Sequence, residues 1–299
     1  GGGPAPPSPP TQGARSRPLA KPPVRMLARK LGVDLAALAP GSGPGGIVTR
    51  GDVERSSDPA DTHTPDVEGL PVRGVRARVA ERMAISRREI ADATCSVTAD
   101  CERLLVVRKT LNTSLVSRGL EPAITPFSLM CTLFVRALCT HPELNARFVA
   151  EGPEIQRYRS IHLGVGTATD RGLLVTVIRG ADQRSVDDLS RELARLSRSA
   201  RDGSLGPADL QGSTVTVSNF GALGLDEGIP VINHPEAAIL GIGAVRQRPQ
   251  VRDDIVVPRH TACLTLAFDH RVADGAEAAA LLCTLRDLIE APELALVHP

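Results

Sequence analysis

The C-terminal third of the chain carries the residues whose types and spacing best suit catalysis. His270 and Asp274 lie in the segment DHRVADG, directly after the apolar run 264–268. This order predicts a rigid strand that ends in titratable groups facing a cleft. A neutral imidazole, with an ordinary pKa of about 6.5, suits a general base near neutral pH. The carboxylate four residues later could fix the turn, but so short a motif fits a structural histidine equally well.

A second polar cluster ends the segment 213–221, whose sequence is STVTVSNFG. Its alternating Val and Thr residues predict a strand that ends in hydroxyl and amide groups before a glycine turn. The hydroxyl of Ser218 could donate to the oxyanion that forms when a thiol attacks a thioester carbonyl. The sequence leaves open that Ser218 only caps the strand end. For His234, beside Pro235, a structural role is favoured.

Residues 70–299 have the pattern of one large α/β domain. Helices are expected at 73–90, 102–117, 126–140, 185–201 and 275–290, and strands at 161–167, 172–178, 213–218, 237–245 and 261–268. The helix over 126–140 is strongly apolar and is expected to be buried. In the helix over 73–90, the expected inward positions are Val75, Val79, Met83 and Ile90.

The first 69 residues predict two linkers around one small helical segment. Residues 1–23 are rich in proline, alanine and glycine, and residues 56–69 form a similar but acidic stretch, so both are expected to be linkers. Between them, apolar residues recur at helical spacing. The expected inward face of this short helix consists of Val24, Leu27, Ala28 and Leu31.

The segment 24–55 also has features of a docking module. Thr49 followed by Asp52 predicts a capping box that begins a second short helix. Residues 1–55 carry eight Lys or Arg against three Asp or Glu. A basic unit of this size fits either a solvated helical hairpin or a module that binds an acidic protein surface.

The bulk composition argues against several functions. A net charge of +1 and an aromatic content of 2% without Trp disfavour nucleic-acid binding. No apolar run is long enough to span a membrane, and no signal peptide is present. The six cysteines form no C-x-x-C pair, which favours reduced thiols in a cytoplasm and predicts no metal site.

Three segments in this order and spacing resemble one known family. VSNFG, NHPEAAILGIGAV and FDHRVADG are similar to the catalytic domain of dihydrolipoamide acyltransferases, the core components of 2-oxo acid dehydrogenase complexes. The resemblance implies the fold of chloramphenicol acetyltransferase for 70–299. Residues 24–55 resemble the family's peripheral subunit-binding domain, and DRGLLVTVIR at 170–179 resembles a strand near the coenzyme A site.

The resemblance assigns roles residue by residue. His270 would be the base that takes the proton of the coenzyme A thiol, Ser218 the hydroxyl that stabilises the tetrahedral intermediate, and Asp274 the carboxylate that supports His270. The site would lie between neighbouring subunits of a homotrimer. Positions expected to bind coenzyme A are Asp170, Arg171, Gly172 and Asn219. Positions expected to bind dihydrolipoamide dehydrogenase or the thiamine-diphosphate-dependent decarboxylating component are Arg25, Arg29 and Arg50.

The chain departs from the family pattern in three places. None of its three lysines lies in the D-K-A turn of a lipoyl domain, so lipoate is expected on a lipoyl domain that this chain does not contain. Thr176 stands where a proline is common. Ala91-Asp92 stands where many relatives have Pro-His, although the surrounding residues resemble branched-chain enzymes of actinobacteria.

The sequence therefore predicts transfer of a branched-chain acyl group, such as 2-methylpropanoyl, to coenzyme A. An acetyl- or succinyl-transferring homologue is the nearest alternative. A stand-alone enzyme of the chloramphenicol acetyltransferase type is disfavoured by the docking module at 24–55. A non-catalytic scaffold is disfavoured because His270, Asp274 and Ser218 are all present.

Overall fold

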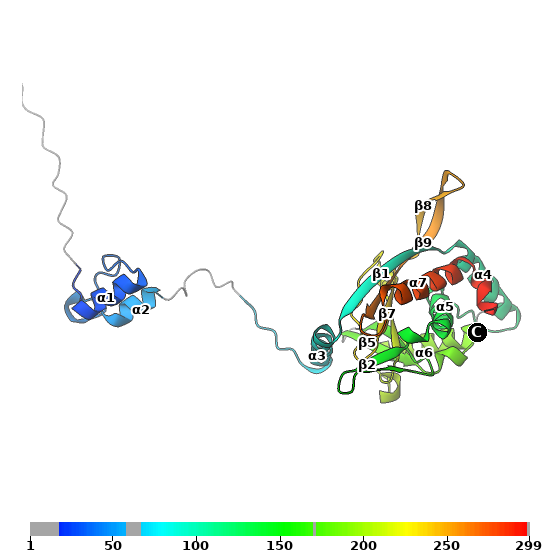
Figure 1. Cartoon of the computed structure of the whole chain (residues 1–299), viewed down its shortest axis with the longest axis horizontal. Helices are drawn as coiled ribbons and strands as arrows, with labels where there is room; N and C mark the ends of the chain where they lie inside the picture. The colour runs from blue at the N-terminus through cyan, green and yellow to red at the C-terminus, as the bar shows by residue number, and fades with distance from the viewer. Residues whose placement is uncertain (1–17, 58–66, 170–171, 298–299) are drawn as a thin grey trace, which may run out of the picture. The chain divides into compact units, whose positions relative to one another are not determined.

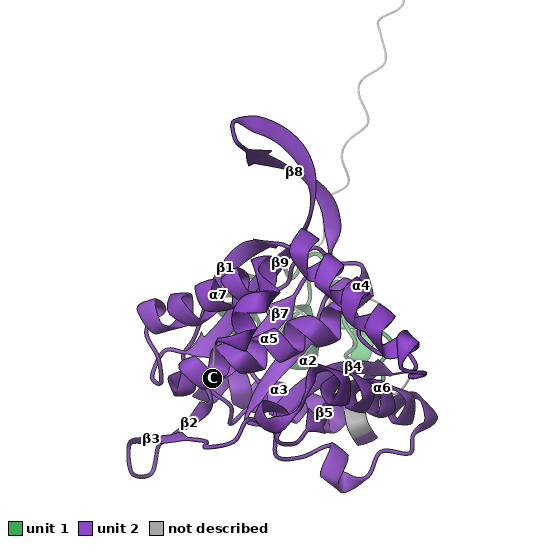
Figure 2. Cartoon of the chain, turned by 90° about the vertical axis from the view of Figure 1, so that its right-hand side faces the viewer, with its two compact units in different colours: residues 1–71 green, residues 72–299 purple. Residues whose placement is uncertain are grey.

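The computed structural model describes residues 18–57, 67–169 and 172–297, except for the side chain of Val75. The chain forms two compact units, residues 1–71 and 72–299, which Figure 2 shows in different colours. Each unit has its own hydrophobic core. The two are therefore described separately.

The first unit is a pair of short helices. Its elements are α1 (Pro22–Leu31), the 3-10 turn η1 (Pro44–Gly46) and α2 (Arg50–Ser57). Three of the four expected inward positions of α1 contact the core, but Leu31 is 42% exposed, so that part of the prediction is wrong. The core of the unit consists of Val24, Ala28, Val48 and Val53.

The predicted capping box of α2 is present. The Asp52 carboxylate accepts the backbone N–H of Thr49 at 2.9 Å, and the Thr49 hydroxyl lies 3.4 Å from the backbone N of Asp52. The backbone amides of Thr49 and Ser42 hold the pKa of Asp52 well below its usual range. The box therefore joins the loop before α2 to the first turn of the helix.

The second unit is built on a seven-stranded sheet. Its path is β1-β9-β7-β6-β4-β5, with β8 paired to β9. The β4–β6 and β6–β7 pairs are parallel and the others antiparallel. The strands are β1 (Asp92–Asp100), β4 (Leu163–Thr169), β5 (Gly172–Ile178), β6 (Val215–Asn219), β7 (Ala238–Ile242), β8 (Arg246–Arg252) and β9 (Ile255–Asp269). A separate hairpin pairs β2 (Ala146–Val149) with β3 (Glu154–Arg157).

Four helices form a layer on one face of this sheet (Figure 1). They are α4 (Glu102–Ser117), α5 (Pro126–Thr140), α6 (Val186–Asp202) and α7 (Gly275–Glu290). The apolar α5 lies at their centre, as its sequence predicts, and it begins with a capping box between Thr125 and Ser128. Short 3-10 turns occur at Pro142–Leu144, Ala181–Gln183, Pro207–Asp209, Gly221–Leu223 and Pro292–Leu296.

Side chains divide between the two faces of the sheet as the strand period requires. Val217 of β6 faces the helical layer and belongs to the main core, whereas its neighbours Thr216 and Ser218 face the other side. The helix α3 (Gly74–Glu89) lies beside β5, where Val79 and Met83 share a hollow with Leu173 and Val175. We call the face of Thr216 and Ser218 the second face.

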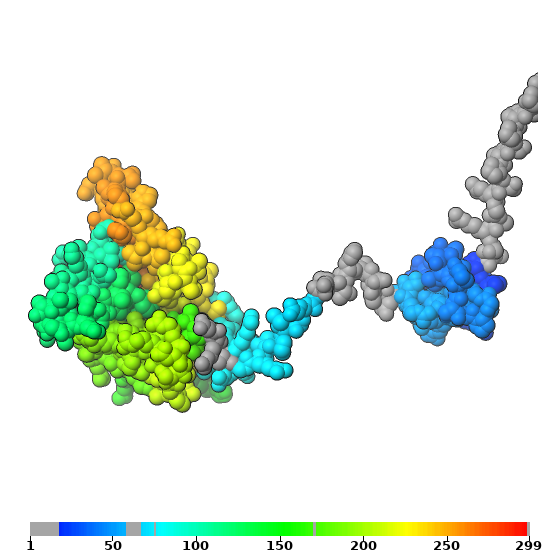
Figure 3. Space-filling model, turned by 180° about the vertical axis from the view of Figure 1, so that it is seen from behind, coloured from blue at the N-terminus to red at the C-terminus, as the bar shows by residue number. Residues whose placement is uncertain are grey.

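The structure corrects several predicted elements. The helix at 73–90 forms as α3, but its residues are mostly exposed, Val79 and Met83 are only half-buried, and buried Ile90 lies beyond its end. The predicted inward position of Val75 lies outside the described side chains. The strand expected at 261–268 begins at Ile255 and forms with β8 a hairpin that projects from the domain (Figure 3). The sequence prediction missed β1, β2, β3 and β8.

Candidate active site

The junction between β9 and α7 holds His270 and Asp274 side by side in one turn. The strand ends at Asp269 and the helix begins at Gly275. The Asp274 carboxylate caps the helix by accepting the backbone N–H groups of Ala276 at 2.8 Å and Glu277 at 3.0 Å. These amides lower the pKa of Asp274, and nearby His270 adds a smaller effect in the same direction. Asp274 thus fixes the turn that carries His270.

The His270 side chain is exposed at the end of a rigid strand. Its backbone N–H donates to the carbonyl of Ala91 at 2.9 Å, and its ring centroid lies 5.6 Å from that of Phe268. These contacts orient the residue while leaving the imidazole open to a substrate. The geometry suits a group that exchanges protons with a bound molecule.

An ion pair between a buried carboxylate and a partly exposed guanidinium stabilises the start of the same turn. Asp269 is 3% exposed at its side chain and receives two guanidinium nitrogens of Arg271, the shorter contact being 2.6 Å. The guanidinium carbon lies 4.4 Å from the centroid of the Phe148 ring. This bidentate pair sets the direction in which the chain leaves β9, and therefore where His270 lies.

Ser218 and Asn219 form the end of β6, on the neighbouring part of the sheet. Ser218 is half-buried and its side chain lies on the second face. The Asn219 side-chain carbonyl accepts the N–H of Ala222 at 3.0 Å, so Asn219 stabilises the turn after the strand. Of the other predicted coenzyme A positions, Gly172 begins β5, and Asp170 and Arg171 lie outside the described residues.

The strand register keeps Ser218 away from His270 within one chain. Ser218 pairs with Gly241 of β7, and Gly241 pairs with Thr265 of β9. Two strand spacings of about 4.8 Å and five residues of about 3.3 Å place the Cα atoms of Ser218 and His270 roughly 19 Å apart. To act on one reacting centre, the two side chains would each have to lie within about 3.5 Å of an atom attacking or bonded to the same carbon. One chain therefore does not bring the two residues together at a single carbon.

A buried carboxylate that the sequence did not single out lies on the second face. Glu236 is 2% exposed and accepts from the hydroxyls of Ser213 at 2.5 Å and Thr216 at 2.6 Å, and from the Asn233 amide at 2.7 Å. Burial raises the pKa of Glu236 to about 7, although the three hydrogen bonds oppose the shift. The network links the loop before β7 to the strand of Ser218. The signal was the acidic residue inside the apolar motif NHPEAAILGIG.

The basic residues of the first unit have different surroundings. Arg25 donates to the carbonyls of Ala20 at 3.0 Å and Pro18 at 2.6 Å, so it holds the segment before α1. Arg29 is exposed, and Arg50 forms an exposed ion pair with Glu54. A hollow of about 300 Å³ lies between the helices. It is lined by Pro23, Val24, Met26, Leu27, Lys30 and Arg50.

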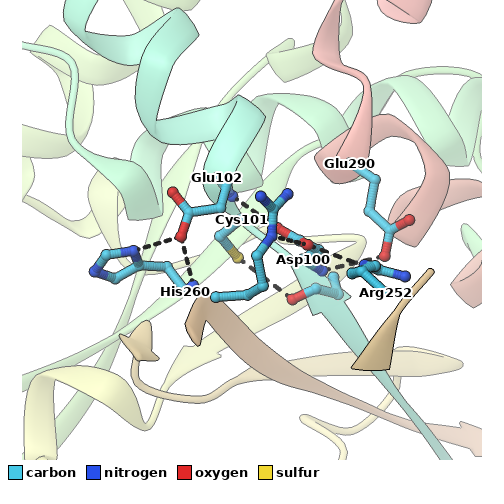
Figure 4. A network of polar contacts seen from close by, with 8 residues as sticks. Asp100, Cys101, Glu102, Arg252, His260 and Glu290 are labelled. Carbon is cyan, nitrogen blue, oxygen red and sulfur yellow. Dashed lines mark hydrogen bonds and ion pairs between the residues drawn. The ribbon is translucent and has the colours of Figure 1, made fainter. Parts of the chain in front are cut away.

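A second polar network lies where β1 ends beside the middle of β9 (Figure 4). Asp100 pairs with Arg252 at 3.1 Å and Arg259 at 2.7 Å, and Glu102 lies 2.8 Å from His260. These contacts join the β8–β9 hairpin to the end of β1 and the start of α4. The ten residues of β9 from His260 to the turn span on the order of 30 Å, so this network is remote from His270.

The described residues contain no group of three or more His, Cys, Asp or Glu side chains that could hold a metal ion. Within the same ranges, no helix is long and apolar enough to cross a membrane.

Each of the two units matches a known family. The model of the 2-oxoacid dehydrogenases acyltransferase catalytic domain matches residues 64–297, and the e3 binding domain model matches residues 18–54. The chain is 37% identical over 288 residues to the lipoamide acyltransferase component of the branched-chain alpha-keto acid dehydrogenase complex of Pseudomonas aeruginosa. This match covers 92% of the chain and 67% of the relative. The chain is also 36% identical over 278 residues to the acetyltransferase component of the acetoin cleaving system of Bacillus subtilis. That match covers 91% of the chain and 69% of the relative.

A solved structure of Azotobacter vinelandii dihydrolipoamide acetyltransferase is also similar. It matches with a TM-score of 0.72 and 30% identity over 78% of this chain and 95% of that one. Its subject is the role of one serine, one histidine and one asparagine in the catalytic mechanism of that enzyme.

Proposed function

We propose that this chain, which belongs to the 2-oxoacid dehydrogenase acyltransferase family, transfers a branched-chain acyl group, such as 2-methylpropanoyl, from dihydrolipoamide to coenzyme A. The chemical types and the spacing of Ser218, His270 and Asp274 support a thioester site. The three positions combine an exposed imidazole, a half-buried hydroxyl and a helix-capping carboxylate.

The spacing of these residues supports their roles. In the Azotobacter vinelandii enzyme, the histidine follows the serine by 52 positions and the asparagine follows the histidine by four. Ser218, His270 and Asp274 have the same spacing. Here the third position is aspartate, which caps α7 through the same type of side-chain oxygen that asparagine offers.

The mechanism follows from the chemistry of these groups. The imidazole of His270 takes the proton of the coenzyme A thiol, because a thiol with a pKa of about 8.5 is mostly protonated at neutral pH. The thiolate attacks the thioester carbonyl of acyl-dihydrolipoamide, and the hydroxyl of Ser218 donates to the resulting oxyanion. Collapse breaks the bond to the dihydrolipoamide sulfur, which leaves as a thiolate and takes the proton back from His270. Coenzyme A and the acyl thioester of dihydrolipoamide are thus the two substrates.

The proposed assembly is based on the separation of roughly 19 Å between the Cα atoms of Ser218 and His270 in one chain. A functional site then needs Ser218 from one copy and His270 from another, which a closed ring of identical subunits provides. We propose a homotrimer whose trimers build a larger core. Asn219 and Gly172, with Asp170 and Arg171, remain proposed contacts for coenzyme A.

Mixing two inactive variants tests both the mechanism and the assembly. His270→Ala and Ser218→Ala are each expected to lose most transfer from acyl-dihydrolipoamide to coenzyme A while still forming oligomers. When equal amounts are unfolded and refolded together, about a quarter of the sites receive an intact histidine and an intact serine, so about a quarter of the wild-type rate should return. Mixtures as inactive as the single variants would refute the shared site. Unchanged turnover in His270→Ala would refute the mechanism.

The branched-chain specificity rests on the relatives. The Pseudomonas aeruginosa protein belongs to a branched-chain complex, whereas the Bacillus subtilis protein is an acetyltransferase at almost the same identity. Comparing isobutyryl-, acetyl- and succinyl-dihydrolipoamide as donors separates these possibilities. A higher kcat/KM for acetyl than for isobutyryl would refute the branched-chain assignment.

The first unit is an e3 binding domain by its family model. We propose that it binds dihydrolipoamide dehydrogenase and the thiamine-diphosphate-dependent decarboxylating component. Lys30 and Arg50 line its hollow, and exposed Arg29 lies on the same helix as Lys30. Because Arg25 holds the unit together, charge reversal is better placed at Lys30 and Arg50. Changing both Lys30 and Arg50 to Glu should weaken binding to the partner enzyme and make that binding less sensitive to salt. Arg201→Glu in the second unit should change neither.

A further inference from the structure

On the second face, the space next to Ser218 is filled on the β7 side and open on the β4 side. On β7, a methyl group placed on Gly241 would lie 2.4 Å from the Phe220 ring, so that ring covers this side of Ser218. On β4, the partner of Ser218 is Gly166, which has no side chain to fill the corresponding position. A group bound at the Ser218 hydroxyl therefore has room in the direction of β4.

The fold leaves room for a methyl group at Gly166. A methyl group at this position would lie 3.6 Å from the carbonyl oxygen of Val217 and 3.8 Å from both the Cα of Ser218 and a methyl of Leu173. These are ordinary contacts, so the fold itself does not require glycine here. Gly164, two residues earlier, differs: a methyl there would lie 2.5 Å from the Thr216 hydroxyl. Packing explains Gly164 but leaves Gly166 unexplained.

Leu173 separates this gap from a larger hollow. Its side chain is 53% exposed, touches the gap with one methyl and lines the hollow of about 220 Å³ between β5 and α3. The hollow walls also include Val79, Met83 and Val175. The polar side chains of Arg78, Arg82, Gln211 and Asn233 also line the hollow, but most of its exposed wall is apolar, which suits an alkyl chain.

We propose that Gly166 and Leu173 form the acyl-chain pocket of the transfer site, with Gly166 admitting the branch of the acyl group beside Ser218 and Leu173 limiting its length. This inference rests on the proposed transfer reaction at Ser218. A pocket that differs by one methylene or methyl group typically discriminates between substrates by 10- to 200-fold, so one added methyl should be measurable.

Two substitutions should move the preference in opposite directions. Gly166→Ala adds a methyl in the gap and should lower kcat/KM for isobutyryl-dihydrolipoamide relative to acetyl-dihydrolipoamide by about tenfold or more. Leu173→Ala joins the gap to the hollow and should raise kcat/KM for hexanoyl-dihydrolipoamide relative to isobutyryl-dihydrolipoamide by about tenfold. Gly152→Ala is the matched control, because a methyl there meets no atom within 4 Å.

Each outcome bears on the proposal. All rates are measured on the full chain, with KM for coenzyme A determined alongside. Opposite shifts in the two ratios, with an unchanged KM for coenzyme A, support the pocket. Equal losses for all acyl groups, or a change confined to the KM of coenzyme A, would show that the gap holds something else and overturn it. If the wild-type chain transferred no acyl group at all, the proposed function itself would fail.

Discussion

The buried carboxylate of Glu236 gives a prediction about stability and pH. Its pKa is raised by burial from its ordinary 4.5 to about 7. Below pH 4.5 the group is protonated in both the folded and the unfolded chain, so its contribution to stability is fully present. As the pH rises toward 7 the unfolded chain loses this proton first, and the free energy of unfolding falls.

The magnitude follows from the size of the pKa shift. A difference of about 2.5 units at 1.36 kcal/mol per unit amounts to about 3 kcal/mol over the whole window. About 2 kcal/mol of this should be lost between pH 5.5 and pH 8. Glu236→Gln keeps the shape of the side chain and an oxygen that accepts from Ser213 or Thr216, but it cannot titrate. The variant should therefore lose about 2 kcal/mol less stability than the wild type over the same range.

The assay is urea unfolding of both proteins at several pH values and one fixed protein concentration, because assembly also affects stability. Glu151→Gln, an exposed position in the β2–β3 turn, is the matched control and should follow the wild type. Parallel pH profiles for the wild type and Glu236→Gln would refute a raised pKa at this position. A wild type that gained stability from pH 5.5 to pH 8 relative to the variant would reverse the sign and refute it as well.

Three other predictions test the packing around the site. Arg271→Ala leaves the buried carboxylate of Asp269 without its partner and should cost about 3 kcal/mol in urea unfolding, and a loss below about 1 kcal/mol would contradict the proposed importance of the pair. Gly164→Ala forces a methyl against the Thr216 hydroxyl and should cost about 1–3 kcal/mol, so a variant with wild-type stability would show that the contact relaxes without penalty. Asp274→Ala should lower both the thermal midpoint and the transfer rate, whereas Asp274→Asn, which still caps α7, should preserve both. Equal losses in the two variants would show that the transfer rate does not depend on capping.

Much of the fold was predictable because its signals are local. The helices α4, α5 and α7 and the strand β5 have the predicted bounds. The strand β1 alternates small apolar and polar residues, a signal that the prediction overlooked. The strand β9 is longer than predicted, because its exposed half, IVVPRH at 255–260, contains a proline and pairs with β8 outside the main body of the sheet.

The sequence by itself determined the family, the chemical types at the site and the turn that carries His270 and Asp274. These depend on residues close together in the chain, so motifs and spacing were sufficient. Only the tertiary structure decided that Ser218 and His270 lie two strands and roughly 19 Å apart in one chain, because strand register is set by pairing between distant segments. The same holds for the burial of Glu236 and for the gap at Gly166. Both depend on contacts between segments that are distant in the sequence, and a local sequence pattern does not predict such contacts.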